Sequence, residues 1–155
     1  MDIREATDRA QKLLQRLPSG DELSFDAQGV CALQSEGAPD LFLEIMPEEE
    51  ILVLSTPLLE VAPKELPTVA VRALALNLYQ IATGGGVLAL DPQSEALVFS
   101  QNISLHADDI DLGAVMSAHI DTALALTADF IVSSFADAVD EPAAGKDEQD
   151  MVIIR

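Results

Sequence analysis

The sequence predicts an α+β domain, in which a mostly antiparallel sheet packs against three helices. Two observations carry this prediction. Three long segments contain apolar residues at the three- and four-residue spacing of helices. Between them lie short segments rich in apolar residues, some with strict alternation, and turn sequences such as DAQG (26–29) and DPQSE (91–95) join two pairs of them as hairpins. The expected order is α-β-β-β-β-α-β-β-α.

The first predicted helix covers residues 2–17, DIREATDRAQKLLQRL, and Pro18 to Gly20 end it. A short strand is expected at Leu23 to Phe25, followed by the turn at 26–29 and a returning strand at 30–34. Two further strands are LFLEI (41–45), with Phe42 and Glu44 on the less apolar face, and ILVLSTPL (51–58), which is apolar on both faces.

The second predicted helix begins near Pro67 and runs to about Ala82. It is apolar nearly all round, and a helix of this kind is buried on more than one side. A small sheet covers only one side of it, so the sequence predicts self-association. The interface residues expected from this argument are Val71, Leu74, Leu78 and Ile81.

Three consecutive glycines, Gly84 to Gly86, follow this helix. A phosphate-binding loop follows a strand and opens a helix, whereas here the order is reversed, so the glycines are interpreted as a helix stop and a joint. Strands are predicted at 87–91 and 96–104, and a third helix begins near Asp108. Residues 1–136 form the predicted domain. The polar segment 137–155 is expected to be a disordered acidic tail.

The chain carries 27 acidic against 8 basic residues, a net charge of −19. This balance argues against binding to nucleic acids or to anionic membrane surfaces, since Lys and Arg carry both. The single Cys31 forms no internal disulfide, which suits a reducing compartment. The first residues lack an apolar signal region, and no uninterrupted apolar run approaches about 18 residues. We therefore expect a cytoplasmic protein with no membrane insertion.

Two sets of residues invite a chemical interpretation. His106 with Asp108, Asp109 and Asp111 resembles a metal site, but acids in the first turn of a helix are also what the helix dipole favours. His119 lies within an apolar helix, where a core residue is more common than a general base. The sequence contains no nucleophile elbow and no dinucleotide fingerprint. It therefore predicts a non-enzymatic binding protein, with no catalytic residue, metal or cofactor.

The order of the elements and several local phrases resemble the class I type III secretion chaperones, the Tir chaperone (CesT-like) family. The resemblance covers about residues 1–136. The chain departs from the pattern in its longer tail and in the late aromatic of the third helix, which Phe130 and Phe135 only approximate. The phrases that carry the resemblance are LSFDAQGVCAL, LFLEI, ILVLSTPL, ALNLYQIATGGG, VLALDP, ALVFSQNISL and TADFI.

The resemblance implies a homodimer that binds the N-terminal segment of a secreted effector in extended form, in the cytoplasm of a Gram-negative bacterium. It also implies delivery to the export apparatus, with the export ATPase as a further expected partner and no ATP hydrolysis by the chaperone. Adjacent helix positions diverge by about 100°, so Leu13, Leu14 and Leu17 are not expected to share one face. Leu13 or Leu17, with Phe42, is the expected client contact. Two alternatives remain open: another interaction module, such as an adaptor or an immunity protein for a toxin, and a small enzyme using His119.

Overall fold

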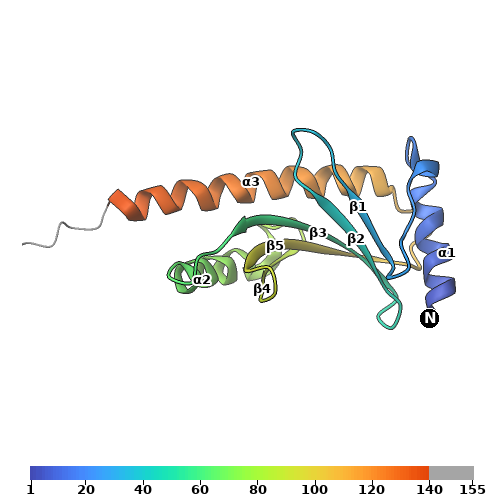
Figure 1. Ribbon diagram of the computed structural model, residues 1–155, viewed down its shortest axis with the longest axis horizontal. Helices are drawn as coiled ribbons and strands as arrows, with labels where there is room; N and C mark the ends of the chain where they lie inside the picture. Colours follow the sequence, from blue (N-terminus) through green and yellow to red (C-terminus); the bar gives the residue numbers. More distant parts are fainter. Residues whose placement is uncertain (140–155) are drawn as a thin grey trace, which may run out of the picture.

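The computed structural model describes residues 1–139 of the chain, with side chains to residue 132. Five strands form one antiparallel sheet in the order β1-β2-β3-β5-β4, and three helices accompany it, which confirms the predicted α+β class (Figure 1). The helices are α1 (Ile3–Leu14), α2 (Leu66–Leu76) and α3 (Leu112–Val139), with short 3-10 turns η1 (Gly20–Glu22) and η2 (Leu78–Gln80). The strands are β1 (Val30–Leu33), β2 (Leu41–Met46), β3 (Ile51–Glu60), β4 (Val87–Asp91) and β5 (Ala96–Ser104).

The predicted strand at Leu23 to Phe25 is not formed, so the sheet has five strands rather than six. The Leu23 amide donates to the Gly20 carbonyl at 3.2 Å, and the Leu23 carbonyl accepts from the Gln11 side chain at 2.8 Å. These bonds tie the segment to α1 and η1 instead of to a neighbouring strand. The turn after it forms as predicted, with the Asp26 carboxylate accepting from two backbone amides and Gly29 at a φ of 80°.

Helix α2 is shorter than predicted, because it ends at Leu76 instead of near Ala82. The side-chain amide of Asn77 pairs with the backbone of Leu88 on β4: Oδ1 accepts from the Leu88 amide at 2.7 Å and Nδ2 donates to the Leu88 carbonyl at 2.9 Å. Tyr79 then takes a left-handed φ of 59°, which breaks the helix before the glycines. Gly86 lies so close to Phe99 that an added Cβ would be 2.5 Å from its ring. The glycines are a joint before β4, but it is Asn77 that caps the helix.

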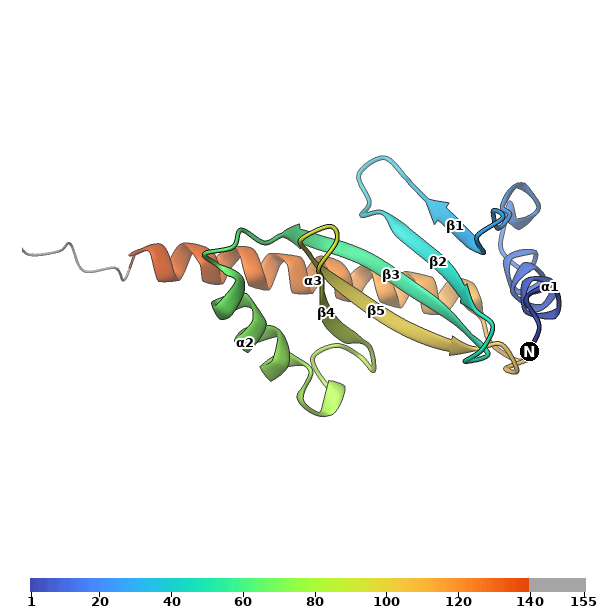
Figure 2. The same ribbon diagram turned by 60° about the horizontal axis from the view of Figure 1, so that its bottom comes forward.

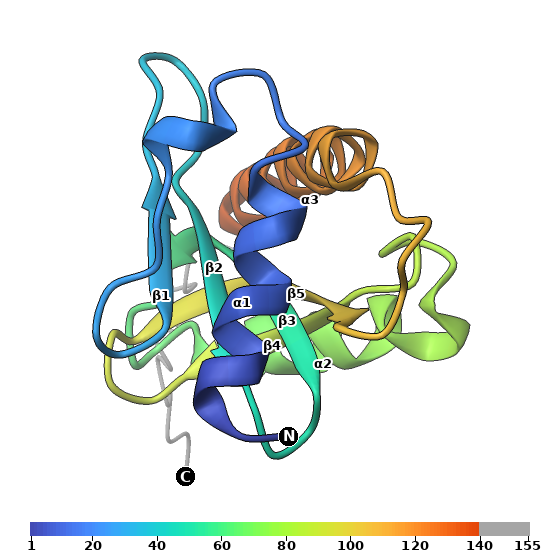
Figure 3. The same cartoon turned by 90° about the vertical axis from the view of Figure 1, so that its right-hand side faces the viewer.

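One face of the sheet holds the core. In β2, Leu41, Leu43 and Ile45 are buried, whereas Phe42 and Met46 between and beyond them are only half-buried. Buried residues of α1 and the start of α3 share a core cluster with β1, β2 and β3, and a second cluster joins α2, α3, β4 and β5 around Phe99. Within the described residues no helix crosses the other face, which lies toward the viewer in Figure 2. Figure 3 shows α1 running across the strands at one end of the fold.

His119 lies where the two clusters meet, and it is only 1% exposed. Its Nε2 is 3.1 Å from the Thr56 hydroxyl, and its ring stacks on Phe99 with centroids 4.5 Å apart. Burial lowers the pKa of His119 to about 4, so the ring is neutral at physiological pH. His119 is therefore a core residue, as expected. Cys31 is also in the core, and burial raises the pKa of its thiol.

Candidate functional site

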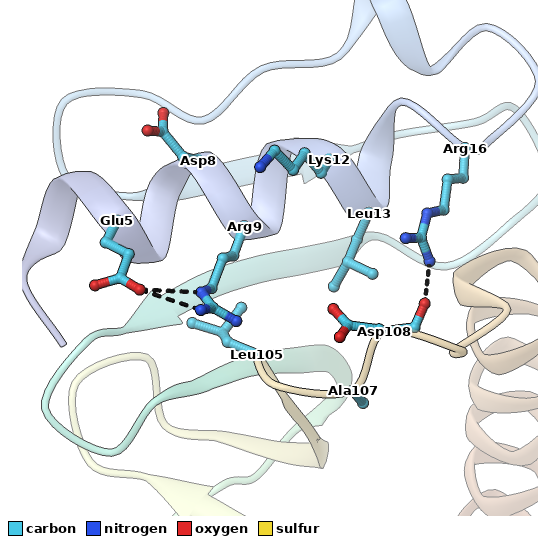
Figure 4. A pocket seen from close by; sticks show the side chains of 9 residues that line it. All are labelled: Glu5, Asp8, Arg9, Lys12, Leu13, Arg16, Leu105, Ala107 and Asp108. Atoms are coloured by element: carbon cyan, nitrogen blue, oxygen red, sulfur yellow. Dashed lines mark hydrogen bonds and ion pairs between the residues drawn. The ribbon is translucent and has the colours of Figure 1, made fainter.

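A groove lies between α1 and the segment that follows β5, and it encloses about 400 Å³ (Figure 4). We call it the α1 groove. Its lining residues are Glu5, Asp8, Arg9, Lys12, Leu13, Arg16, Leu105, Ala107 and Asp108. Apolar side chains form part of its wall, and charged side chains of both signs surround them (Figure 4).

The sequence of α1 explains why this wall is charged. The helix begins at the Asp2 cap, whose carboxylate accepts from the Glu5 amide at 2.8 Å. Ala6 and Ala10 then face the core, which places Arg9, Lys12 and Arg16, spaced three and four residues apart, on the neighbouring side. Four of the eight Lys and Arg residues of the chain occur in its first 16 positions, so this is the most basic part of a strongly acidic protein.

The three cations are engaged to different degrees. Arg9 pairs with Glu5 at 3.2 Å, one helical turn away. The Arg16 guanidinium donates to the Asp108 carbonyl at 2.7 Å and thereby holds the segment after β5 against α1. Lys12 is exposed and makes no hydrogen bond or ion pair with any described residue. It is the positive charge of the groove that is available to a partner.

The three leucines of the first segment are buried to different extents. Leu13 is 5% exposed and Leu14 is fully buried, whereas Leu17 is half-buried. Leu13 and Leu14 both meet apolar groups, because α1 packs against the sheet on one side and against Leu105 on another. Leu13 still contributes to the wall of the groove, and Leu17 is half-buried at the edge of the core.

Phe42 lies on the uncovered face of the sheet, half-buried between its neighbours Ala32 of β1 and Ser55 of β3. It is therefore on the opposite side of β2 from the core that Leu13 joins. The structure does not bring these two predicted contacts into one patch. A segment that touches both has to pass from one face of the sheet to the other, around a sheet edge or around the ends of the strands.

A second surface is formed by α2 and the turn after it. Val71 and Leu74 are each 70% exposed, Leu78 is 61% exposed and Ile81 is 82% exposed. We call these four residues the apolar α2 surface. Tyr79 is also 82% exposed beside it, and our sequence analysis did not single it out. The one feature of the sequence that marks Tyr79 is its position two residues after Asn77, which caps the helix. Its exposure depends on the turn after Asn77, and apolar periodicity does not predict that turn.

The HADDID segment serves local structure. His106 lies 2.6 Å from Glu50 through Nε2 and Oε2, and the hydrogen bond from His106 lowers the pKa of Glu50 below its ordinary value. Asp111 accepts a hydrogen bond from the Ala114 amide at 3.0 Å, at the start of α3. In the part of the chain that the structure describes, no three His, Cys, Asp or Glu side chains gather as metal ligands do.

The model of the Tir chaperone protein (CesT) family matches residues 10–127 of this sequence, which is most of the chain. The chain belongs to the Tir chaperone protein (CesT) family. The match begins inside α1 and ends inside α3. The matched range of this Tir chaperone family member includes the whole sheet and the apolar α2 surface. It also includes the groove residues from Lys12 onward.

Solved structures with similar folds include three complexes. The ExsC–ExsE complex aligns at a TM-score of 0.59 with 19% identity, covering 79% of this chain and 92% of that one. The HopA1–SchA chaperone–effector complex aligns at 0.53 with 21% identity, covering 83% and 96%. The ExoU–SpcU complex of the Pseudomonas aeruginosa type III secretion system aligns at 0.53 with 20% identity, covering 78% and 93%. A comparison with curated protein sequences finds no match.

Helix α3 of this Tir chaperone family member is long and apolar enough, by length and composition alone, to cross a membrane over Leu112–Val132. Core helices of soluble proteins pass the same test. Here α3 buries Leu112, Leu126 and Phe130 in the two core clusters, and Asp121 and Asp129 interrupt its apolar sequence.

Proposed function

We propose that this protein is a type III secretion chaperone that binds the N-terminal segment of a secreted effector in extended form. The family to which the chain belongs supports this function, and similar folds occur in complexes such as the HopA1–SchA chaperone–effector complex. The observation that carries the proposal is the α1 groove. It combines three apolar side chains (Leu13, Leu105 and Ala107) and an unengaged Lys12 with the densest basic segment of an acidic chain, which suits a segment of polypeptide better than a small molecule.

The edge of β1 supports an extended client. The Val30 amide and carbonyl are both bonded to Asp26, while the Gly29 carbonyl accepts from Ile45 on β2. Because alternate residues of an antiparallel strand point to the same side, Ala32 directs its backbone groups away from β2. Ala32 is exposed and forms the open part of this edge. An extended segment that pairs with this edge gains backbone hydrogen bonds and lies close to Phe42, the register partner of Ala32.

The apolar α2 surface supports a homodimer. Large apolar side chains gathered on one surface of a monomer are unusual and mark an interaction site. Buried against a second copy, each of these four side chains contributes on the order of 1–3 kcal/mol. The client and the second copy then occupy opposite ends of the fold, because α1 and α2 lie at opposite ends of the sheet in both views (Figures 1 and 2).

We further propose that the chaperone works without hydrolysing ATP, in the cytoplasm of a Gram-negative bacterium, and that it delivers its client to the export ATPase. The client test uses a tagged chain in the source bacterium and mass spectrometry of the protein that co-purifies. We expect a secreted protein bound through its N-terminal segment. A folded partner that binds equally well without that segment would overturn the proposal and favour an adaptor or immunity protein.

The contact residues are tested with Leu17→Asp combined with Phe42→Asp. We expect unchanged circular dichroism and an affinity for the client that is at least tenfold lower, which corresponds to about 1.4 kcal/mol. Ala89→Asp is the matched control, since Ala89 is exposed on the same uncovered face but lies on β4, at the other edge of the sheet. Full client binding by the folded double variant would place the client elsewhere.

A further inference from the structure

A second hollow lies at the N-terminal end of α2, where the segments after β3 and between β4 and β5 meet it. We call it the α2 pocket. It encloses about 520 Å³, and its lining is mostly apolar: Val61, Pro63, Leu66, Ala70, Leu90 and Pro92. Asp91 and Glu95 complete the lining. An apolar pocket with carboxylate acceptors at its lining suits a phenol, which has an apolar ring and one hydroxyl donor.

The turn after α2 presents such a phenol. Tyr79 and Gln80 take left-handed φ values of 59° and 54°, which are unusual for residues other than glycine. Bonds on both sides hold this turn: the Gln80 amide donates to the Asn77 carbonyl at 3.1 Å, and the Gly85 amide donates to the Gln80 carbonyl at 3.0 Å. The Asn77 side chain is itself fixed to β4. The Tyr79 side chain is therefore held in an outward position, 82% exposed to solvent.

The α2 pocket and Tyr79 lie on either side of the apolar α2 surface. Ala70 precedes Leu74 by four residues, or about 6 Å of helix, and Tyr79 follows it by five. In a two-fold dimer every contact occurs twice, and two features on opposite sides of the axis in one copy meet each other across the interface. With the axis near Leu74, the N-terminal end of α2 in one copy faces the turn after α2 in the other copy.

We propose that Tyr79 of each copy fills the α2 pocket of the other copy. This inference rests on the proposed homodimer and names the contact that fixes its geometry. The Tyr79 ring packs on Leu66, Ala70 and Leu90 of the partner subunit, and its hydroxyl donates to one of the two carboxylates. Aromatic anchors in fully desolvated pockets are where binding energy concentrates in interfaces. The stripe from Leu66 through Ala70 to Leu74 makes the pocket continuous with the apolar α2 surface.

The test is sedimentation of the full chain over a concentration series. We expect the wild type to dimerise, and Tyr79→Ala and Ala70→Phe each to raise the dimer dissociation constant at least tenfold. Tyr79→Phe, which keeps the ring, should retain most of the affinity. Both substitutions remove the same contact. The dimer dissociation constant of the double variant should therefore be no higher than that of the single variant with the lower affinity. Tyr79 is exposed, so Tyr79→Ala leaves the fold of a single copy intact, which circular dichroism verifies.

A covalent measurement complements this series. In a Cys31→Ser background, Ala70→Cys with Tyr79→Cys should form a disulfide-linked dimer on mild oxidation, whereas Ala89→Cys with Tyr79→Cys should not. A wild-type dimer that neither single variant weakens, and that forms no such crosslink, overturns the Tyr79 contact but leaves the dimer standing. A wild type that sediments as a monomer at tens of micromolar overturns the dimer and this contact together. Client co-purification reports separately on the chaperone function.

Discussion

The Nε2 atom of His119 lies 3.1 Å from the Thr56 hydroxyl, in the seam between the two halves of the core. Its Nδ1 has no hydrogen-bond partner among the described residues. This buried pair links α3 to the central strand β3, and its polarity gives the core a measurable sensitivity to pH.

Acidification should destabilise the fold in a defined window. Burial lowers the pKa of His119 from 6.5 to about 4, so between these values the unfolded chain binds a proton that the folded chain excludes. The free energy of unfolding is therefore not reduced by His119 well above pH 6.5, and it falls as the pH drops toward 4. We expect a loss of about 2 kcal/mol between pH 7 and pH 5, measured by chemical denaturation. His119→Leu is the control, and an equal loss in that variant would assign the effect to other groups.

Removing the hydroxyl partner should cost more than removing both members of the pair. Thr56→Val leaves both nitrogens of a buried imidazole without a hydrogen bond, which should lower the free energy of unfolding by about 1–3 kcal/mol. The double variant Thr56→Val with His119→Leu should recover at least half of that loss, because it leaves no buried polar group unpaired. Additive losses in the two single variants and the double variant would contradict the pairing.

Gly86→Ala should destabilise the protein through overpacking. A Cβ at this position would lie 2.5 Å from the Phe99 ring and 2.7 Å from the Ser100 carbonyl oxygen. We expect a loss of about 1–3 kcal/mol and a lower melting temperature. The matched variant is Gly85→Ala, which meets open space but has a φ of 91°, so its cost is backbone strain alone. If Gly85→Ala were the more damaging substitution, close packing of Gly86 on Phe99 would not be the dominant constraint.

Reversing the charge of Lys12 should weaken client binding without affecting the fold. Lys12 is exposed in the α1 groove, so Lys12→Glu removes its attraction for client carboxylates and adds a repulsive charge to an already acidic chain. We expect a several-fold lower affinity for the co-purified effector by calorimetry, and a weaker dependence on salt. Lys64→Glu is the control, because Lys64 is exposed just before α2, at the other end of the sheet. Equal effects of both substitutions would indicate a response to net charge alone.

Periodicity was sufficient for much of this fold. The alternation of β2 and the segments 87–91 and 96–104 appear as predicted, because their side chains repeat with the period of a half-buried strand. The prediction failed where a side chain replaces a backbone partner. Gln11 holds Leu23 and keeps its segment out of the sheet, and Asn77 caps α2 seven residues before the first glycine. Neither contact has a signal in local composition.

The candidate surfaces were predicted to different depths. The second helix is apolar nearly all round, which is more apolar surface than one sheet can cover. This excess is visible in the sequence and pointed to Val71 and Leu74, which are exposed in a single copy. The position of Leu13 depends on the segment after β5, about ninety residues along the chain. The α2 pocket depends on three segments meeting. Those facts belong to tertiary packing, which local patterns do not encode.

The pairing of Asn77 with Leu88 shortens the exposed backbone of β4. Alternation directs the backbone groups of Leu88 and Leu90 away from β5, and the Asn77 side chain occupies those of Leu88. Leu90 is then the one open residue of β4, as Ala32 is the one open residue of β1. A long row of unpaired amides and carbonyls at a sheet edge is what templates pairing between copies. Neither edge of the described sheet offers such a row, so the sheet can hold a short polypeptide segment without acting as a template for a fibre.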